Sequence, residues 1–176
     1  MDEKYARYVE TEPYLLFKGA KNDIIDIRAS VKDDESSIEE KAYKICFNAT
    51  RAAEKILKGY IRYKDENIDI KMTHDLDYLI RIVTEIDEKF KHIENDCDIL
   101  DPYKSWTGYE PLLVIEKQEV IDVLKSLKNI YEFPLIKEAR DTLNNQHNFN
   151  TLPDNIMENI LTMITNNIDG TGNGPD

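Results

Sequence analysis

The sequence predicts an all-α protein, and three observations lead to this prediction. Apolar residues recur every three or four positions along several long stretches, as they do in amphipathic helices. No stretch alternates apolar and polar residues between hairpin turns, as half-buried strands do. Several prolines and capping residues lie at the ends of the periodic stretches. We therefore expect an up-and-down bundle of about five or six helices.

The chain has 176 residues, which is enough for one domain with its own core. We expect an N-terminal arm over residues 1–12, a single helical domain over 13–166 and a flexible tail over 167–176. No apolar run approaches the ~20 residues of a membrane-spanning helix, and the start lacks a signal-peptide pattern. We therefore expect a cytoplasmic protein without a membrane partner. Cys46, and Cys97 in a polar loop, should remain reduced thiols, and no metal-ligand spacing accompanies them.

The formal net charge of -12 opposes non-specific attraction to a polyanion. Any site for a nucleotide or RNA must therefore be a local cluster of Lys and Arg. The simpler interpretation of the charge is that the excess of acidic residues keeps the protein soluble.

The central element of the predicted bundle is a helix that follows Ser37 and runs to about residue 64. Ser37 and Glu40 have the spacing of a capping box. Glu54 and Lys58 lie one turn apart on the side that we expect to be solvated. Small and apolar residues at helical spacing form its expected buried stripe: Ile45, Ala49, Ala52, Ala53, Ile56, Leu57 and Tyr60.

The other elements are arranged around this helix. A first helix is predicted over about 13–31, and a third begins at an N-cap Thr73, with Asp75 and Asp77 in its first turn, and extends to Phe90. Residues 94–111 lose the periodicity and are predicted to be a long connection that packs on the bundle. Further helices are predicted over about 117–131, from about 135 into an asparagine-rich stretch, and after Pro153.

Three segments stand in a familiar order: CFNATRAAEKILKGYI, MTHDLDYLI and YKSWTGYEP. Together they resemble the HEPN family (higher eukaryotes and prokaryotes nucleotide-binding domain), over about residues 17–131. The matching positions of the first two segments are Cys46, Phe47, Ala49, Ala52, Ala53, Glu54, Lys55, Leu57, Lys58, Thr73, His74, Asp75 and Leu76. The resemblance implies a helical bundle that often dimerises.

The chain departs from the family pattern at several positions. Asn48 stands where the family has His, and Thr50 and Arg51 stand where it has two Gln. The Arg of the family's Arg-Tyr-Pro element is absent from residues 108–111. Gly59, in a helix interior, indicates a close crossing of helices or subunits.

The resemblance implies one of two functions. One group of HEPN proteins comprises metal-independent ribonucleases with an Arg, four to six residues and a His near the start of the fourth helix. The other binds nucleotides or a nucleotidyltransferase partner. Residues 94–116, before the fourth predicted helix, contain neither Arg nor His. We therefore expect a homodimeric member of the second group, within a toxin-antitoxin or defence module, without catalysis or a cofactor of its own.

Two alternatives remain open. Arg140 and His147 have the ribonuclease spacing, one helix too late, and could supply phosphate stabilisation and general acid-base catalysis. A solvated helix end is the competing interpretation of this pair. An acidic adaptor or inhibitor that mimics nucleic acid is the other alternative function.

The candidate ligand-binding residues fall in three places. Arg51 and Lys55 could meet a phosphate, or belong to a solvated charged strip with Glu54 and Lys58. His74 and Asp75 begin the third helix, where a histidine also serves as a neutral capping group. The aromatic residues Tyr103, Trp106 and Tyr109 could stack a base or cover the end of the core.

Overall fold

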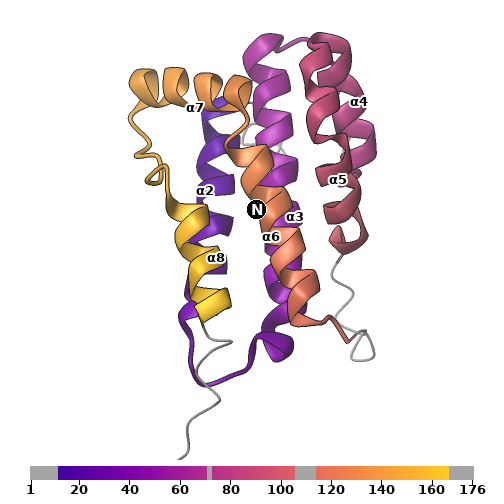
Figure 1. Ribbon diagram of the computed structural model, residues 1–176. Coiled ribbons are helices and arrows are strands. Elements are labelled where there is room, and N and C mark those ends of the chain that lie inside the picture. Colours follow the sequence, from indigo (N-terminus) through magenta and orange to yellow (C-terminus); the bar gives the residue numbers. More distant parts are fainter. Residues whose placement is uncertain (1–11, 71–72, 106–113, 167–176) are drawn as a thin grey trace, which may run out of the picture.

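The computed structural model describes residues 12–70, 73–105 and 114–166, and these ranges contain helices and no strands (Figure 1). The all-α fold class is thereby confirmed. The elements in chain order are α2 (Pro13–Lys32), α3 (Ile38–Lys64), α4 (Leu76–Ile86), the 3-10 helix η1 (Glu88–Ile93), α5 (Glu94–Leu100), the 3-10 helix η2 (Asp101–Tyr103), α6 (Lys117–Tyr131), α7 (Pro134–His147) and α8 (Ile156–Asn166).

Helix α3 is the centre of the bundle. Its start is fixed by the predicted capping box, in which the Glu40 N–H donates to Ser37 Oγ at 3.2 Å and the Ser37 N–H donates to the Glu40 carboxylate at 2.8 Å. It contacts α2, α4, α5, α6 and α7. In Figure 1, α2, α3 and α6 run lengthwise through the molecule, while α7 lies across one end. This arrangement leaves little of α3 in contact with water.

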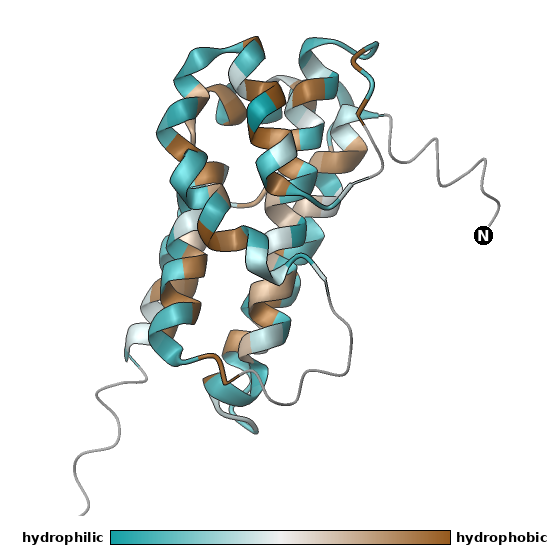
Figure 2. Ribbon diagram, turned by 90° about the vertical axis from the view of Figure 1, so that its right-hand side faces the viewer, coloured by the Kyte–Doolittle hydropathy of each residue, from teal (hydrophilic) through white to brown (hydrophobic). Residues whose placement is uncertain are grey.

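The apolar sides of the helices face one another and form the core (Figure 2). Every residue of the predicted α3 stripe is fully buried. Gly59 marks a crossing of α2 and α3, because a Cβ atom at this position would lie only 3.1 Å from a ring carbon of Phe17. The close helix crossing expected at Gly59 is therefore between helices of one chain.

The third predicted helix begins later and ends earlier than the sequence pattern predicted. Its N-cap is Asp75, which accepts a hydrogen bond from the Tyr78 N–H at 3.2 Å, and the prediction of Thr73 was wrong. Thr73 instead accepts from the Asp75 N–H at 3.0 Å. The helix ends before Asp87, whose side chain starts η1, and Phe90 is buried from η1. Apolar spacing alone did not reveal this second capping residue.

The segment after residue 93 was predicted as an irregular connection, and its first part is helical. Helix α5 has seven residues with three carboxylates, so it is too short and too acidic to show an apolar period. Cys97, expected in a polar loop, is fully buried in it, and both cysteines are free thiols. The Thr50 hydroxyl of α3 donates to the Leu100 carbonyl at 2.8 Å and joins α5 to the core.

Some predictions concern parts of the chain outside the described residues: most of the N-terminal arm, the tail, and the connection that contains Trp106 and Tyr109. Within the described ranges, no helix has the length and apolar character needed to cross a lipid bilayer.

The burial pattern predicts a large difference between two isoleucine truncations. Ile56→Ala removes a side chain that is fully buried in α3, and should lower the free energy of unfolding by about 2–5 kcal/mol. Ile25→Ala on α2 removes a side chain that is 43% exposed, and should change it by less than about 1 kcal/mol. Urea unfolding measures both values. Equal losses in the two variants would contradict the packing described above.

Candidate functional site

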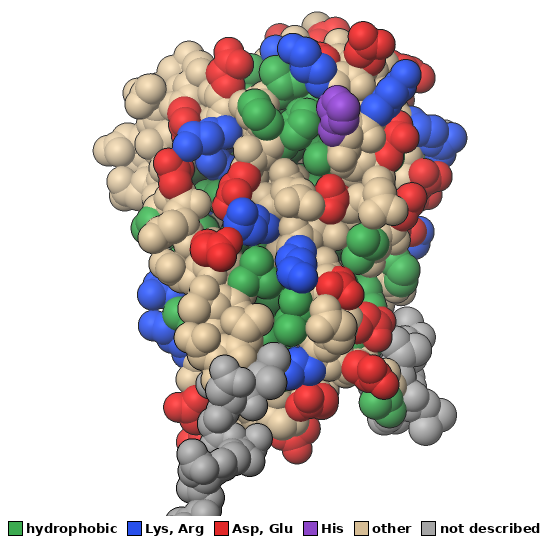
Figure 3. Space-filling view, in the orientation of Figure 1, with side chains coloured by type: hydrophobic (Ala, Val, Ile, Leu, Met, Phe, Trp, Pro, Cys, Tyr) green, Lys and Arg blue, Asp and Glu red, His purple; other side chains and the backbone are tan. Residues whose placement is uncertain are grey.

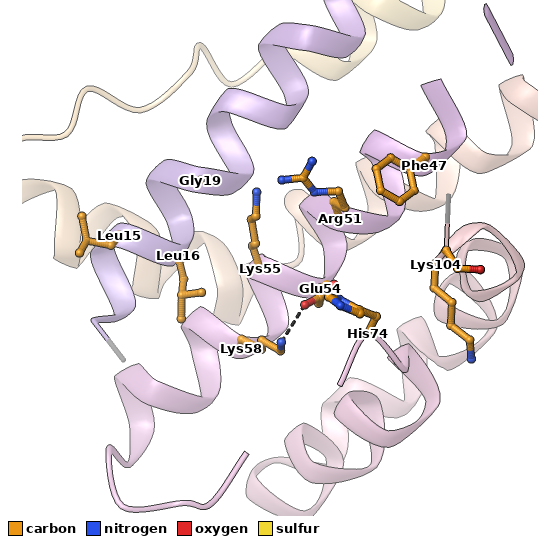
Figure 4. A pocket seen from close by; sticks show the side chains of 11 residues that line it. Leu15, Leu16, Gly19, Phe47, Arg51, Glu54, Lys55, Lys58, His74 and Lys104 are labelled. Atoms are coloured by element: carbon orange, nitrogen blue, oxygen red, sulfur yellow. Dashed lines mark hydrogen bonds and ion pairs between the residues drawn. The ribbon is translucent and has the colours of Figure 1, made fainter. Parts of the chain in front are cut away.

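A groove opens between α2 and α3, bordered by the residues before α4 and after η2 (Figure 4). Its volume is about 650 Å³. We call it the α2–α3 groove, and it is lined by Leu15, Leu16, Gly19, Phe47, Arg51, Glu54, Lys55, Lys58, His74, Lys104 and Ser105.

One face of α3 supplies most of the charged side chains. Glu54, Lys55 and Lys58 follow Arg51 by three, four and seven positions, so all four project from the same side of the helix. The opposite side of α3 carries the buried stripe and fixes the rotation of the helix about its axis. Packing of the core therefore determines that these four side chains face the groove.

A buried carboxylate beneath the groove holds two of the cations. Asp23 of α2 is only 4% exposed, and its Oδ2 accepts a hydrogen bond from Lys55 Nζ at 2.6 Å. Arg51 Nη2 lies 3.7 Å from the other carboxylate oxygen. Burial raises the pKa of Asp23, although the hydrogen bond from Lys55 acts in the opposite direction. Gly19 makes room for this contact, because a Cβ atom there would be 3.1 Å from Lys55 Cδ.

A second carboxylate, that of Glu54, joins Lys58 and His74. Lys58 Nζ donates to Glu54 Oε1 at 2.7 Å, and His74 Nδ1 lies 2.9 Å from Oε2. Glu54 and Lys58 are buried, so the expectation that they form a solvated strip was wrong. The reason is tertiary: α2 and the segment before α4 cover this side of α3.

The more accessible cations of the groove are Arg51 and Lys104. The Arg51 side chain is 44% exposed, and its guanidinium carbon lies 5.6 Å from the centre of the Phe47 ring. Lys104 Nζ donates to Asp101 Oδ2 at 2.7 Å, and this hydrogen bond raises the pKa of Lys104. Among the described residues, no cluster of three or more His, Cys, Asp or Glu side chains could hold a metal ion.

The groove brings together three of the candidate ligand-binding residues: Arg51, Lys55 and His74. His74 was expected in the first helical turn, whereas it precedes the N-cap and its side chain is 73% exposed. Asp75 does not line the groove and serves as the N-cap of α4. Trp106 and Tyr109 lie outside the described residues.

The side chains of Arg140 and His147 have separate partners. Arg140 is 4% exposed, donates to the Tyr131 carbonyl at 2.8 Å and stacks over the Tyr131 ring. His147 is exposed at the end of α7 and stacks on Tyr14 of α2, with the ring centres 4.1 Å apart. Neither residue lines the α2–α3 groove.

The sequence interpretation missed Asp23, Phe47 and Lys104 as residues around the site. Asp23 did carry a signal, since it lies three positions after Ala20 and four before Ile27, within the apolar face of α2. A charged residue on such a face needs a buried partner. No comparable signal distinguishes Lys104, which reaches the groove only because η2 ends beside α3.

The raised pKa of Asp23 predicts a pH-dependent effect of Asp23→Asn. At pH values between the ordinary 3.8 and the raised pKa, Asp23 binds more protons in the folded chain than in the unfolded chain. Its contribution to the free energy of unfolding therefore increases as the pH falls through that window. The stability of the wild type relative to Asp23→Asn should therefore be greater at about pH 4 than at pH 7. Urea unfolding at both pH values measures this difference. A relative stability that falls on acidification would show that the ion pair with Lys55 dominates instead.

Comparison with known proteins gives a single finding. A family model described as the HEPN domain matches residues 16–141, most of the chain. No curated protein and no solved structure matches. The matched range includes α3 and all the lining residues of the α2–α3 groove except Leu15. The chain therefore belongs to the HEPN domain family.

Proposed function

We propose that the protein binds a phosphate group of a nucleotide or of RNA in the α2–α3 groove and has no catalysis of its own. One observation carries this proposal: four Lys and Arg side chains line a single groove of a chain whose net charge is -12. Phosphate contacts with Lys and Arg dominate the binding of nucleic acids. Membership of the HEPN family supports a function related to nucleotides or RNA.

The geometry suits this role because the cations are already positioned. Asp23 orients Lys55, and Glu54 orients Lys58, before any ligand arrives. Ordered side chains lose less conformational entropy on binding than free ones. The planar guanidinium of Arg51 can donate two parallel hydrogen bonds to a phosphate. Leu15 and Leu16 form an apolar wall that can receive a sugar or base.

The partner is the next part of the proposal. We infer a homodimer that associates with a nucleotidyltransferase-type protein in a cytoplasmic toxin-antitoxin or defence module. The support is the family and the absence of Arg and His between residues 94 and 116. Light scattering of the purified protein, with and without such a partner, tests both associations.

The two alternative functions have less support. The ribonuclease alternative relies on the spacing of Arg140 and His147. It has less support because the Arg140 guanidinium is already hydrogen-bonded to the Tyr131 carbonyl and stacked on the Tyr131 ring. The adaptor alternative requires a face that is mainly acidic. The face seen in Figure 3 instead carries Lys and Arg side chains among Asp and Glu side chains.

Removing the accessible guanidinium should weaken binding. Arg51→Gln is expected to reduce the affinity for a fluorescent oligoadenylate about tenfold, equivalent to ~1.4 kcal/mol, because a charge-assisted contact is lost. Lys125→Gln is the matched control, since Lys125 is an exposed cation of α6 that does not line the groove. Fluorescence anisotropy measures both affinities. Equal losses in the two variants would place the binding outside the groove.

The absence of catalysis can be tested with RNA. Incubation with labelled RNA in the presence of a metal chelator should give no cleavage by the wild type or by His147→Ala. Gel electrophoresis resolves the products. Cleavage by the wild type that is lost in His147→Ala would establish the ribonuclease alternative in place of our proposal.

A further inference from the structure

We propose that the α2–α3 groove accepts one phosphate group, so that it recognises a single nucleoside monophosphate unit and discriminates against nucleoside triphosphates. This inference deepens the proposed function and depends on it. The unit can be a free nucleotide or one residue of an RNA strand.

The groove has nearly balanced charges. Four cations line it, and three of them are held by carboxylates at hydrogen-bond distance: Lys55 by Asp23 at 2.6 Å, Lys58 by Glu54 at 2.7 Å and Lys104 by Asp101 at 2.7 Å. These four cations and their three hydrogen-bonded carboxylates together leave one positive charge. A phosphodiester carries one negative charge and neutralises this excess. The phosphate of a free nucleoside monophosphate carries about -1.5 to -2 and exceeds it by at most one, whereas a triphosphate carries still more negative charge.

Arg51 is the cation with the weakest existing contact among these four. Its Nη2 lies 3.7 Å from Asp23, whose carboxylate already accepts a short hydrogen bond from Lys55. The Arg51 side chain is also the most exposed of the four, at 44%. Arg51 therefore has N–H groups that can donate hydrogen bonds to one phosphate. The three lysines have fewer, because each already donates to a carboxylate.

The carboxylates cannot easily give up their partners. The side chains of Asp23 and Glu54 are 6% and 10% exposed, so an unpaired charge on either would be costly. A second or third phosphate beside Lys55 or Lys58 would compete with these carboxylates and be repelled by them. This built-in negative charge selects against a triphosphate.

The rest of the groove suits the remainder of a nucleotide. Leu15 and Leu16 of α2 form an apolar wall, and the Phe47 ring lies beside Arg51 on α3. Figure 4 shows Arg51 and Phe47 on neighbouring turns of α3, with the leucines on the facing helix. A sugar and base can therefore contact these side chains while the phosphate meets Arg51.

The test compares ligands that differ in phosphate number. Calorimetry without divalent cations would measure the affinities of the dinucleotide ApA, with one phosphodiester, and of AMP and ATP. We expect ApA or AMP to bind at least several-fold more tightly than ATP. Binding of ApA identifies a unit within a strand, and binding of AMP alone identifies a free nucleotide. If ATP binds at least as tightly as ApA and AMP, the inference is overturned and the proposed function stands. If none of the three ligands binds, the inference and the proposed function are both overturned.

The dependence on salt gives a second measurement. For a single strand, the logarithm of the binding constant falls with the logarithm of salt concentration by ~0.7 for each neutralised phosphate. A 12-residue oligoadenylate should therefore give a slope of about -0.7. A slope of about -2 would show that the groove neutralises three phosphates, which contradicts the inference.

Glu54→Gln tests the role of the built-in negative charge. The amide keeps the size of the side chain but releases Lys58 from its ion pair, so the slope should steepen to about -1.4 and ATP should bind several-fold more tightly. Asp122→Asn makes the same charge change on α6, where Asp122 does not line the groove, and should alter neither value. Thermal unfolding verifies that both variants are folded. Equal gains in the two variants would show that net charge alone sets the affinity.

Discussion

The close crossing of α2 and α3 is the constraint on which the core and the groove both depend. Gly59 lets the Phe17 ring of α2 approach the backbone of α3, and Gly19 lets the Lys55 side chain pass across α2 to Asp23. Side chains at these two positions would separate the helices or displace Lys55. The same approach that excludes water from the core therefore brings the buried carboxylate beneath the cations.

This arrangement has an energetic cost. Burial raises the pKa of Asp23 even though Lys55 donates a hydrogen bond to it, so desolvation outweighs the favourable ion pair. A hydrophobic pair would fill the same space with less penalty. In return, the charged pair holds Lys55 in one position beside the groove.

The residues that match the HEPN family have two separate roles in the structure. Cys46, Ala49, Ala52 and Ala53 are fully buried and pack the centre of the bundle. Glu54, Lys55, Lys58 and His74 line the α2–α3 groove, and Asp75 begins the helix that holds His74 beside it. The family pattern on α3 thus encodes both the packing of the helix and the charges of the site, on opposite sides of the same element.

The sequence by itself determined the all-α class, the boundaries of α2, α3, α6 and α7 within a few residues, and the buried stripe of α3, because these follow from local periodicity and capping. It also indicated Arg51, Lys55 and His74 as candidate ligand-binding residues in separate places, and the structure brings them into one groove. Only the tertiary structure decided that Glu54 and Lys58 are buried, that Asp23 reaches Lys55, and that Lys104 joins them from the end of η2. These contacts join segments from 20 to 50 or more positions apart, and helical periodicity carries no information about which helix covers a charged face.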